Sequence, residues 1–228
     1  MSVNEVEAYT WLESLDLSSS ETCSTVMHIF QGFQEGNSDD FSDYPLALWH
    51  QVFQLVLWPR FTKALNRHQI QLRQVASAHA VEWSLIWTSN LEIQRLNKEA
   101  RGKDSATDVL SFPLWESVSE DSTEDNAKDS PLPTLPLVSL GDCFVSLPWA
   151  KDHWQEKDLD LGRDWNRLPL ELGLAGYCLE RVLHGCLHLY GQHHDTPEAF
   201  EIVRTIQSEA LAPLFEQISL EALLKGGS

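Results

Sequence analysis

The sequence lacks several features that would place it in a specialised class of protein. No apolar run approaches the roughly 20 residues that a membrane-spanning helix needs. The four cysteines include no C-x-x-C pair and are too sparse for a disulfide scaffold, so we expect a reduced, cytoplasmic protein. The first residues do not combine a basic region with an apolar stretch, which predicts no secretory signal. These absences favour a globular protein with no membrane partner.

Positive charge is also scarce, but its distribution matters more than its total. The net charge of −18 comes from 16 basic and 34 acidic residues and at first argues against a nucleic-acid partner. Residues 1–43 hold nine acidic and no basic residues, and residues 115–136 hold six acidic residues and one lysine. Residues 44–114 instead hold eight basic and five acidic residues. The acidity therefore belongs mostly to two segments, and the central body is mildly basic.

The two acidic segments suggest how the chain is organised. Residues 1–43 are predicted to be an acidic, mobile N-terminal arm with one short amphipathic helix over residues 6–17. Residues 44–228 are predicted to form a single catalytic domain, interrupted by an acidic, low-complexity insertion at about 115–136.

Within the domain, hydrophobic periodicity predicts a small sheet covered by helices, an α+β fold. Three segments have the alternation and composition of strands: residues 81–87, 108–112 and 138–147. Four segments have helical periodicity: residues 45–66, 91–100, 169–190 and 197–212.

The most informative segment reads H-G-C-L-H-L-Y-G-Q-H-H and covers residues 184–194. His184 and His188 are four residues apart, which places both imidazoles on one face of a helix. Gly191 permits the left-handed backbone that ends a helix, so the chain can fold back and bring His194 to the same point. Three neutral imidazoles with a fourth position open to water form a catalytic metal site. The segment therefore predicts such a site at the end of a long helix.

The third ligand and the metal leave alternatives open. His193 is adjacent to His194; we prefer His194 as the ligand and His193 as a contact to the site or to substrate. The imidazole set favours one Zn²⁺ per chain, although other divalent metals such as nickel or copper also fit. Asp195 could orient a ligand imidazole, but capping of the next helix is the preferred interpretation. The alternative to a metal site is a histidine cluster that interacts with the helix dipole.

One residue separates this segment from the metzincin proteases, which share its histidine spacing. Their motif is H-E-x-x-H-x-x-G-x-x-H, and the glutamate after the first histidine is the general base. Gly185 occupies that position here. A metal held by the histidines could still polarise a phosphoryl oxygen, so the pattern favours metal-assisted hydrolysis of a bond other than the peptide bond.

Two motifs together resemble the YbeY family of bacterial endoribonucleases that mature ribosomal RNA. The histidine segment is similar to H-G-x-L-H-L-x-G-x-D-H, with His193 at the position of the aspartate. Residues 96–113 are similar to L-N-x-x-x-R-G-K-D-x-x-T-D-V-L-S-F-P, and L-G-D at residues 140–142 resembles the strand that follows. The resemblance covers about residues 45–217 and implies an α+β fold in which a mixed sheet packs against the metal-binding helix.

The resemblance also implies that Arg101 is a catalytic or RNA-phosphate-binding residue, which makes Arg101 and His188 the predicted catalytic residues. The local sequence agrees in kind, because Arg95, Lys98, Arg101 and Lys103 are clustered and a guanidinium binds phosphate in bidentate fashion. For Arg95 and Lys98 we prefer a simpler role, compensation of the helix dipole.

The sequence therefore predicts a metal-dependent, single-strand-specific endoribonuclease in ribosomal RNA maturation and ribosome quality control. His184, His188 and His194 would hold the metal, Arg101 would bind phosphate, and metal-bound water is the candidate nucleophile. The predicted partners are single-stranded ribosomal RNA and the small ribosomal subunit. Two alternatives remain open: a divergent zinc metallopeptidase whose base comes from elsewhere in the fold, and a non-enzymatic ribosome-assembly factor with a structural metal.

Overall fold

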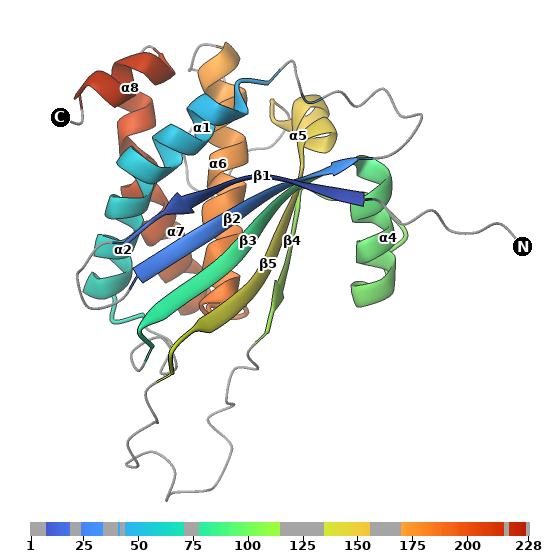
Figure 1. Ribbon diagram of the computed structural model, residues 1–228, viewed down its shortest axis with the longest axis horizontal. Helices are drawn as coiled ribbons and strands as arrows, with labels where there is room; N and C mark the ends of the chain where they lie inside the picture. Colours follow the sequence, from blue (N-terminus) through green and yellow to red (C-terminus); the bar gives the residue numbers. More distant parts are fainter. Residues whose placement is uncertain are drawn as a thin grey trace, which may run out of the picture.

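The protein, seen here as a computed structural model, is built on a five-stranded mixed sheet with strand order β1-β2-β3-β5-β4 (Figure 1). The described residues are 8–18, 24–33, 41, 44–70, 78–114, 135–155, 170–216 and 219–226. The strands are β1 Ala8–Asp16, β2 Ser24–Phe33, β3 Ala80–Thr88, β4 Val109–Pro113 and β5 Val138–Ser146. β2, β3 and β5 are parallel to one another, whereas β1 and β4 run antiparallel at the two edges. The predicted α+β class with a mixed sheet is confirmed.

Helices cover the two faces of the sheet unequally (Figure 1). One face carries α1 Leu46–Val52, the π-helical segment η2 Phe53–Leu57, α2 Trp58–Arg67, α6 Leu170–Leu189, α7 Pro197–Leu211 and α8 Leu220–Gly226. The opposite face carries α4 Asn90–Arg101; α5 Leu147–His153 follows β5, and the 3₁₀ helix η4 Ala212–Glu216 follows α7. Within the described part of the chain, no helix is long and apolar enough to cross a membrane.

The alternation of side chains along the strands divides the core between these two layers. Trp83 and Trp87 of β3 are buried in the large core under α1, α2, α6 and α7. Ile86 points to the opposite face of the sheet. There it packs in a smaller cluster with Ile93 of α4 and Phe144 of β5. Because residues i and i+2 of a strand share a face, the sequence pattern of the strands sets which helix each side chain meets.

The ends of α4 place Arg101 at a defined point. Ser89 caps the first turn, since its Oγ accepts a hydrogen bond from the Glu92 backbone nitrogen at 3.2 Å. Gly102 ends the helix with a φ of +69°, a left-handed conformation that glycine adopts without steric cost. Arg101 is therefore the last residue of α4, and the chain turns away directly after it.

The helix predicted over residues 6–17 is wrong, because the described residues of the predicted N-terminal arm form strands instead. β1 and β2 occupy this region, and β1 is pinned to the helices: Trp58 Nε1 donates to the Leu17 carbonyl oxygen at 2.8 Å, and Glu13 pairs with His50 at 2.5 Å. A register shift between Trp11 and Glu13 is the physical reason for the wrong prediction, because a bulge interrupts strict alternation and leaves apolar residues at helix-like spacing. Of the predicted insertion, residues 115–134 lie outside the described residues.

α6 approaches the sheet closely at Gly185. A β-carbon at this position would lie 2.3 Å from Cys143 Sγ and 3.0 Å from Ser111 Oγ. The Ser111 hydroxyl also donates a hydrogen bond to the Gly185 carbonyl oxygen at 3.2 Å. Glycine is therefore required here by packing, and its position fixes how α6 sits on β4 and β5.

We predict that Gly185→Ala lowers the free energy of unfolding by about 1–3 kcal/mol, the usual cost of overpacking a core. At an unhindered helical position the same change would stabilise the protein, since alanine favours the helix by roughly 0.8–1.0 kcal/mol. Urea unfolding of the wild type, Gly185→Ala, Cys143→Ala and the double variant measures the effect. The double variant should recover part of the loss; a single Gly185→Ala variant as stable as the wild type would contradict the close approach.

Candidate metal centre and phosphate-binding residues

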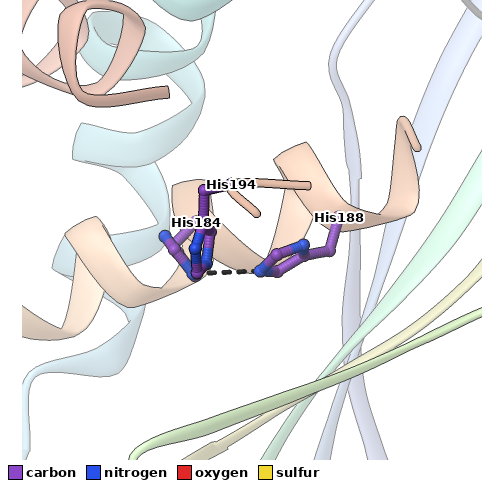
Figure 2. Close-up of side chains that lie close together, drawn as sticks. All are labelled: His184, His188 and His194. Atoms are coloured by element: carbon purple, nitrogen blue, oxygen red, sulfur yellow. Dashed lines mark hydrogen bonds between the residues drawn. The ribbon is translucent and has the colours of Figure 1, made fainter. Parts of the chain in front are cut away.

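Three histidines converge at the C-terminal end of α6 (Figure 2). His184 and His188 lie one turn apart on the helix, and His194 returns to them after a turn at Gly191, whose φ is +73°. Each residue offers one ring nitrogen, and these three atoms lie within 4.8 Å of one another. The histidine spacing predicts this convergence, including the glycine turn that allows it.

The spacing of the nitrogens fits a shared metal ion. The Nε2 atoms of His184 and His188 are 3.0 Å apart. Two nitrogens bound to one tetrahedral zinc at about 2.0–2.1 Å would lie about 3.3–3.4 Å apart, so little movement is needed. The side chain of His194 is exposed while the other two are partly buried, which leaves the site open to solvent on one side.

Both helical imidazoles are held in the uncharged form that a metal requires. Burial, with smaller contributions from neighbouring positive charge, lowers the pKa of His184 to about 3. Burial also lowers the pKa of His188 to about 4, and His194 adds to this decrease. Their ring nitrogens therefore keep free lone pairs at neutral pH, the state in which imidazole binds a divalent metal.

His193 and Asp195, the two neighbours of His194, lie outside the group of converging ligand atoms. The His193 ring lies 5.8 Å from the His188 ring, but His193 is not among the residues whose ligand atoms converge. Asp195 does not cap the next helix as predicted: Thr196 is the N-cap of α7, and its Oγ1 accepts from the Ala199 backbone nitrogen at 3.2 Å. A threonine directly before a proline was an equally good capping signal in the sequence.

Arg101 lies close enough to the histidines for its charge to act on them, since it contributes to the lowered pKa of His188. The other cations of the segment differ in their pairing. Arg95 contacts Glu92 and Glu99 at 2.7 Å each, and Lys98 contacts Asp104 at 2.7 Å.

Arg101 and Lys103 are exposed and have no ion-pair partner among the described residues. The sequence favoured phosphate binding for Arg101 and a simpler role for Arg95 and Lys98. The pairing of Arg95 and Lys98 with carboxylates supports this distinction. In the described part of the chain, Arg101 and Lys103 are therefore the cations of this segment that are available for a phosphate.

The turn that carries Lys103 is braced from α4. Asn97 Nδ2 donates to the Ser105 carbonyl oxygen at 2.8 Å, and the backbone nitrogen of Lys103 donates to the Asn97 carbonyl oxygen at 3.3 Å. Asp104 is held by Lys98 and also by Gln94, whose Nε2 donates to its carboxylate at 3.0 Å. These contacts give the R-G-K-D turn a fixed shape beside the metal centre, which a phosphate group could use without ordering the loop.

A buried polar network behind the histidines was missed in the sequence analysis. Tyr177 Oη donates to Asp108 Oδ2 at 2.8 Å, and Arg181 Nη1 lies 3.4 Å from the same oxygen. Arg181 also donates to Glu180, which in turn accepts from Gln207 of α7. Charged residues one turn before His184 on an otherwise apolar helix were the available signal, because buried charges are usually paired.

The site leaves no room for the base of a metzincin protease. That base would have to project from position 185, where even a β-carbon would overlap Cys143. The packing around position 185 thus supports the prediction from the sequence that the chain lacks the glutamate base of a metzincin.

Comparison with known proteins agrees with these observations. The model of the family described as Endoribonuclease YbeY matches residues 58–214. Proteins named endoribonuclease YbeY include one from an Exiguobacterium species, 34% identical over 68% of this chain and 84% of its own length, and one from Listeria welshimeri, 38% identical over 57% and 71%.

Another protein of that name, from a Sulfurihydrogenibium species, is 36% identical; the alignment covers 52% of this chain and 59% of the relative. A solution structure from Thermotoga maritima aligns with 83% of this chain and 92% of its own at 22% identity, with a TM-score of 0.40. The family match covers the helix that carries the histidines and the R-G-K-D turn. The resemblance found in the motifs is therefore confirmed, and the chain belongs to the YbeY endoribonuclease family.

Proposed function

We propose that this protein is a metal-dependent endoribonuclease that cleaves single-stranded ribosomal RNA in the cytoplasm during maturation and quality control of the small ribosomal subunit. The observation that carries the proposal is the juxtaposition of three convergent imidazoles with Arg101, an exposed arginine that no described carboxylate pairs with. Membership of the YbeY family supports the choice of RNA as substrate.

His184, His188 and His194 would hold one divalent metal, with Zn²⁺ favoured by an all-imidazole set. When bound, the metal would supply Lewis-acid polarisation of a phosphoryl oxygen and activation of water. Arg101 would bind the non-bridging oxygens of the same phosphate and stabilise the negative charge that grows on them during cleavage. Lys103, two residues further along the braced turn, would contact a neighbouring phosphate.

The acidic composition is compatible with this role because the positive charge is local. Among the described residues, no carboxylate pairs with Arg101 or Lys103, although the chain has a net charge of −18. A metzincin-type peptidase is disfavoured because position 185 admits no glutamate, and the family match disfavours a peptidase whose base comes from elsewhere in the fold. An assay of RNA cleavage distinguishes a nuclease from a non-enzymatic assembly factor.

We predict that His188→Ala and His194→Ala each weaken zinc binding by about 10²–10³-fold, since structural zinc sites share about 10–16 kcal/mol among four ligands. His193→Ala is the matched control, with the same substitution one residue from a proposed ligand. Competition with a chromophoric chelator gives the dissociation constants. A large loss in His193→Ala with none in His194→Ala would exchange the two residues; no loss in any variant would exclude a histidine-bound metal.

We predict that Arg101→Ala lowers the rate of single-stranded RNA cleavage by about 10²–10³-fold, the usual cost of losing one preorganised electrostatic contact to the transition state. Lys103→Ala should mainly weaken RNA binding and reduce the slope of log affinity against log salt by about 0.7, as expected for one lost phosphate contact on a single strand. Lys63→Ala, which removes an exposed cation from α2, is the charge-matched control.

Gel-resolved cleavage under single-turnover conditions and binding titrations at several salt concentrations measure these effects. Equal cleavage rates for the wild type, His188→Ala and Arg101→Ala would refute the proposed nuclease. Metal-dependent folding with RNA binding but no cleavage by the wild type would favour the assembly factor instead.

A further inference from the structure

Phe200 is an aromatic residue in the first turn of α7 that belongs to neither hydrophobic cluster. Thr196 caps this helix, and the Phe200 backbone nitrogen donates to the Thr196 carbonyl oxygen at 2.9 Å, which fixes the start of the helix. Phe200 is only partly buried, and among the described residues neither the large core nor the smaller cluster includes it. Packing of the interior therefore does not explain this phenyl ring.

The register of α7 directs Phe200 toward the end of α6. Val203 and Gln207 follow it by three and seven residues, spacings that share one side of a helix. Both are buried, and Gln207 donates a hydrogen bond to Glu180, so this side of α7 faces α6. The two helices run in opposite directions and are joined by a short connection, so the start of α7 lies beside the last turn of α6, which carries His188.

Phe200 contacts the third predicted metal ligand. The ring centres of His194 and Phe200 are 6.4 Å apart, and their planes make an angle of 82°. An edge-to-face contact of this kind occupies at most one face of the phenyl ring. The side chain of His194 is exposed, so the contact lies on the side of the histidine cluster that is open to solvent. A flat apolar surface is thus present on the open side of the site.

A phenyl ring in this place suits a base of the substrate, whereas phosphate would go to the metal and to Arg101. Arg101 ends α4, on the opposite face of the sheet from α6 and α7, so the two residues belong to different layers (Figure 1). The unstacked bases of a single strand are bound by proteins through stacking on aromatic side chains. In a duplex, neighbouring base pairs cover the faces of each base. An aromatic platform beside the site therefore favours an unpaired nucleotide.

We propose that Phe200 is a base-stacking residue that holds one nucleotide of single-stranded RNA beside the cleaved phosphate. The inference rests on the proposed nuclease function and names the part of the substrate that the open side of the site binds. Because every base has a π face, the contact selects unpaired nucleotides without selecting a base sequence.

A cycle of substitutions in both the protein and the RNA tests this contact. The substrate is a short single-stranded RNA whose cleaved bond has been mapped, and matched substrates carry an abasic nucleotide on one side of this bond or the other. Phe200→Leu keeps an apolar side chain against His194 and removes the π face, whereas Phe200→Trp keeps an aromatic ring. Ile202→Ala is the matched control, because it truncates another exposed apolar residue of α7.

Single-turnover cleavage by the zinc-loaded protein at several enzyme concentrations gives kcat, KM and kcat/KM for each pair. One of the two abasic substitutions should lower kcat/KM of the wild type by about 10–100-fold, the usual loss when a base loses its stacking partner. Phe200→Leu should lower kcat/KM on the intact RNA by a similar factor, through KM rather than kcat, and should lose nothing more on that abasic RNA. Phe200→Trp and Ile202→Ala should stay close to the wild type.

Independent, additive losses from Phe200→Leu and the abasic substitutions would overturn the proposal, as would a wild type that cleaves both abasic RNAs as fast as the intact RNA. Chelator competition tests a purely supporting role: if Phe200→Leu weakens zinc binding as much as it lowers kcat/KM, Phe200 supports His194 and binds no base. A wild type that cleaves no RNA would refute the proposed nuclease. The same cycle on RNA affinity would then decide the role of Phe200, since coupling with an abasic nucleotide would support stacking and additive losses would overturn it.

Discussion

The close approach of α6 to β5 at Gly185 is the constraint on which the rest of the site depends. Because no side chain fits between this position and Cys143, the helix lies directly on the sheet. His184 precedes the contact and His188 follows it by three residues, so both imidazoles are buried enough to stay uncharged. Arg101, at the end of α4, then supplies positive charge beside an uncharged ligand set. The packing of the sheet and the proposed binding of metal and phosphate are thus linked through one glycine.

Much of the fold follows from local sequence patterns, and the main error has a physical cause. The strands and the helix between residues 81 and 112 were predicted, as were α6 and α7, because periodicity, caps and glycines agree there; α8 was not predicted. The N-terminal strands were missed because a bulge near Trp11 disturbs the alternation of β1 and the acidic composition suggests disorder. β2 pairs with β1 and also with β3, and a parallel partner as distant in sequence as β3 leaves no local signal.

The candidate site was more predictable than the fold around it. The histidine cluster is built from one short segment: two histidines four residues apart, a glycine turn and a third histidine. It could therefore be predicted without knowing how the sheet is arranged. The pairing of the cations in this segment could be predicted only in part from the sequence, because the contact of Lys98 with Asp104 depends on how the turn folds back. The hydrogen bond from Gln207 on α7 to Glu180 on α6 joins residues 27 positions apart, and no sequence pattern marks such a contact.

X-ray absorption spectroscopy at the zinc edge of the metal-loaded protein tests the central claim most directly, because it reports the type and number of atoms around the ion. The account predicts three imidazole nitrogens at about 2.0–2.1 Å and one further light ligand in the open position. His194→Ala should reduce the imidazole count by one and leave the fold intact. A sulfur ligand at about 2.3 Å, or no more than two imidazoles in the wild type, would contradict it.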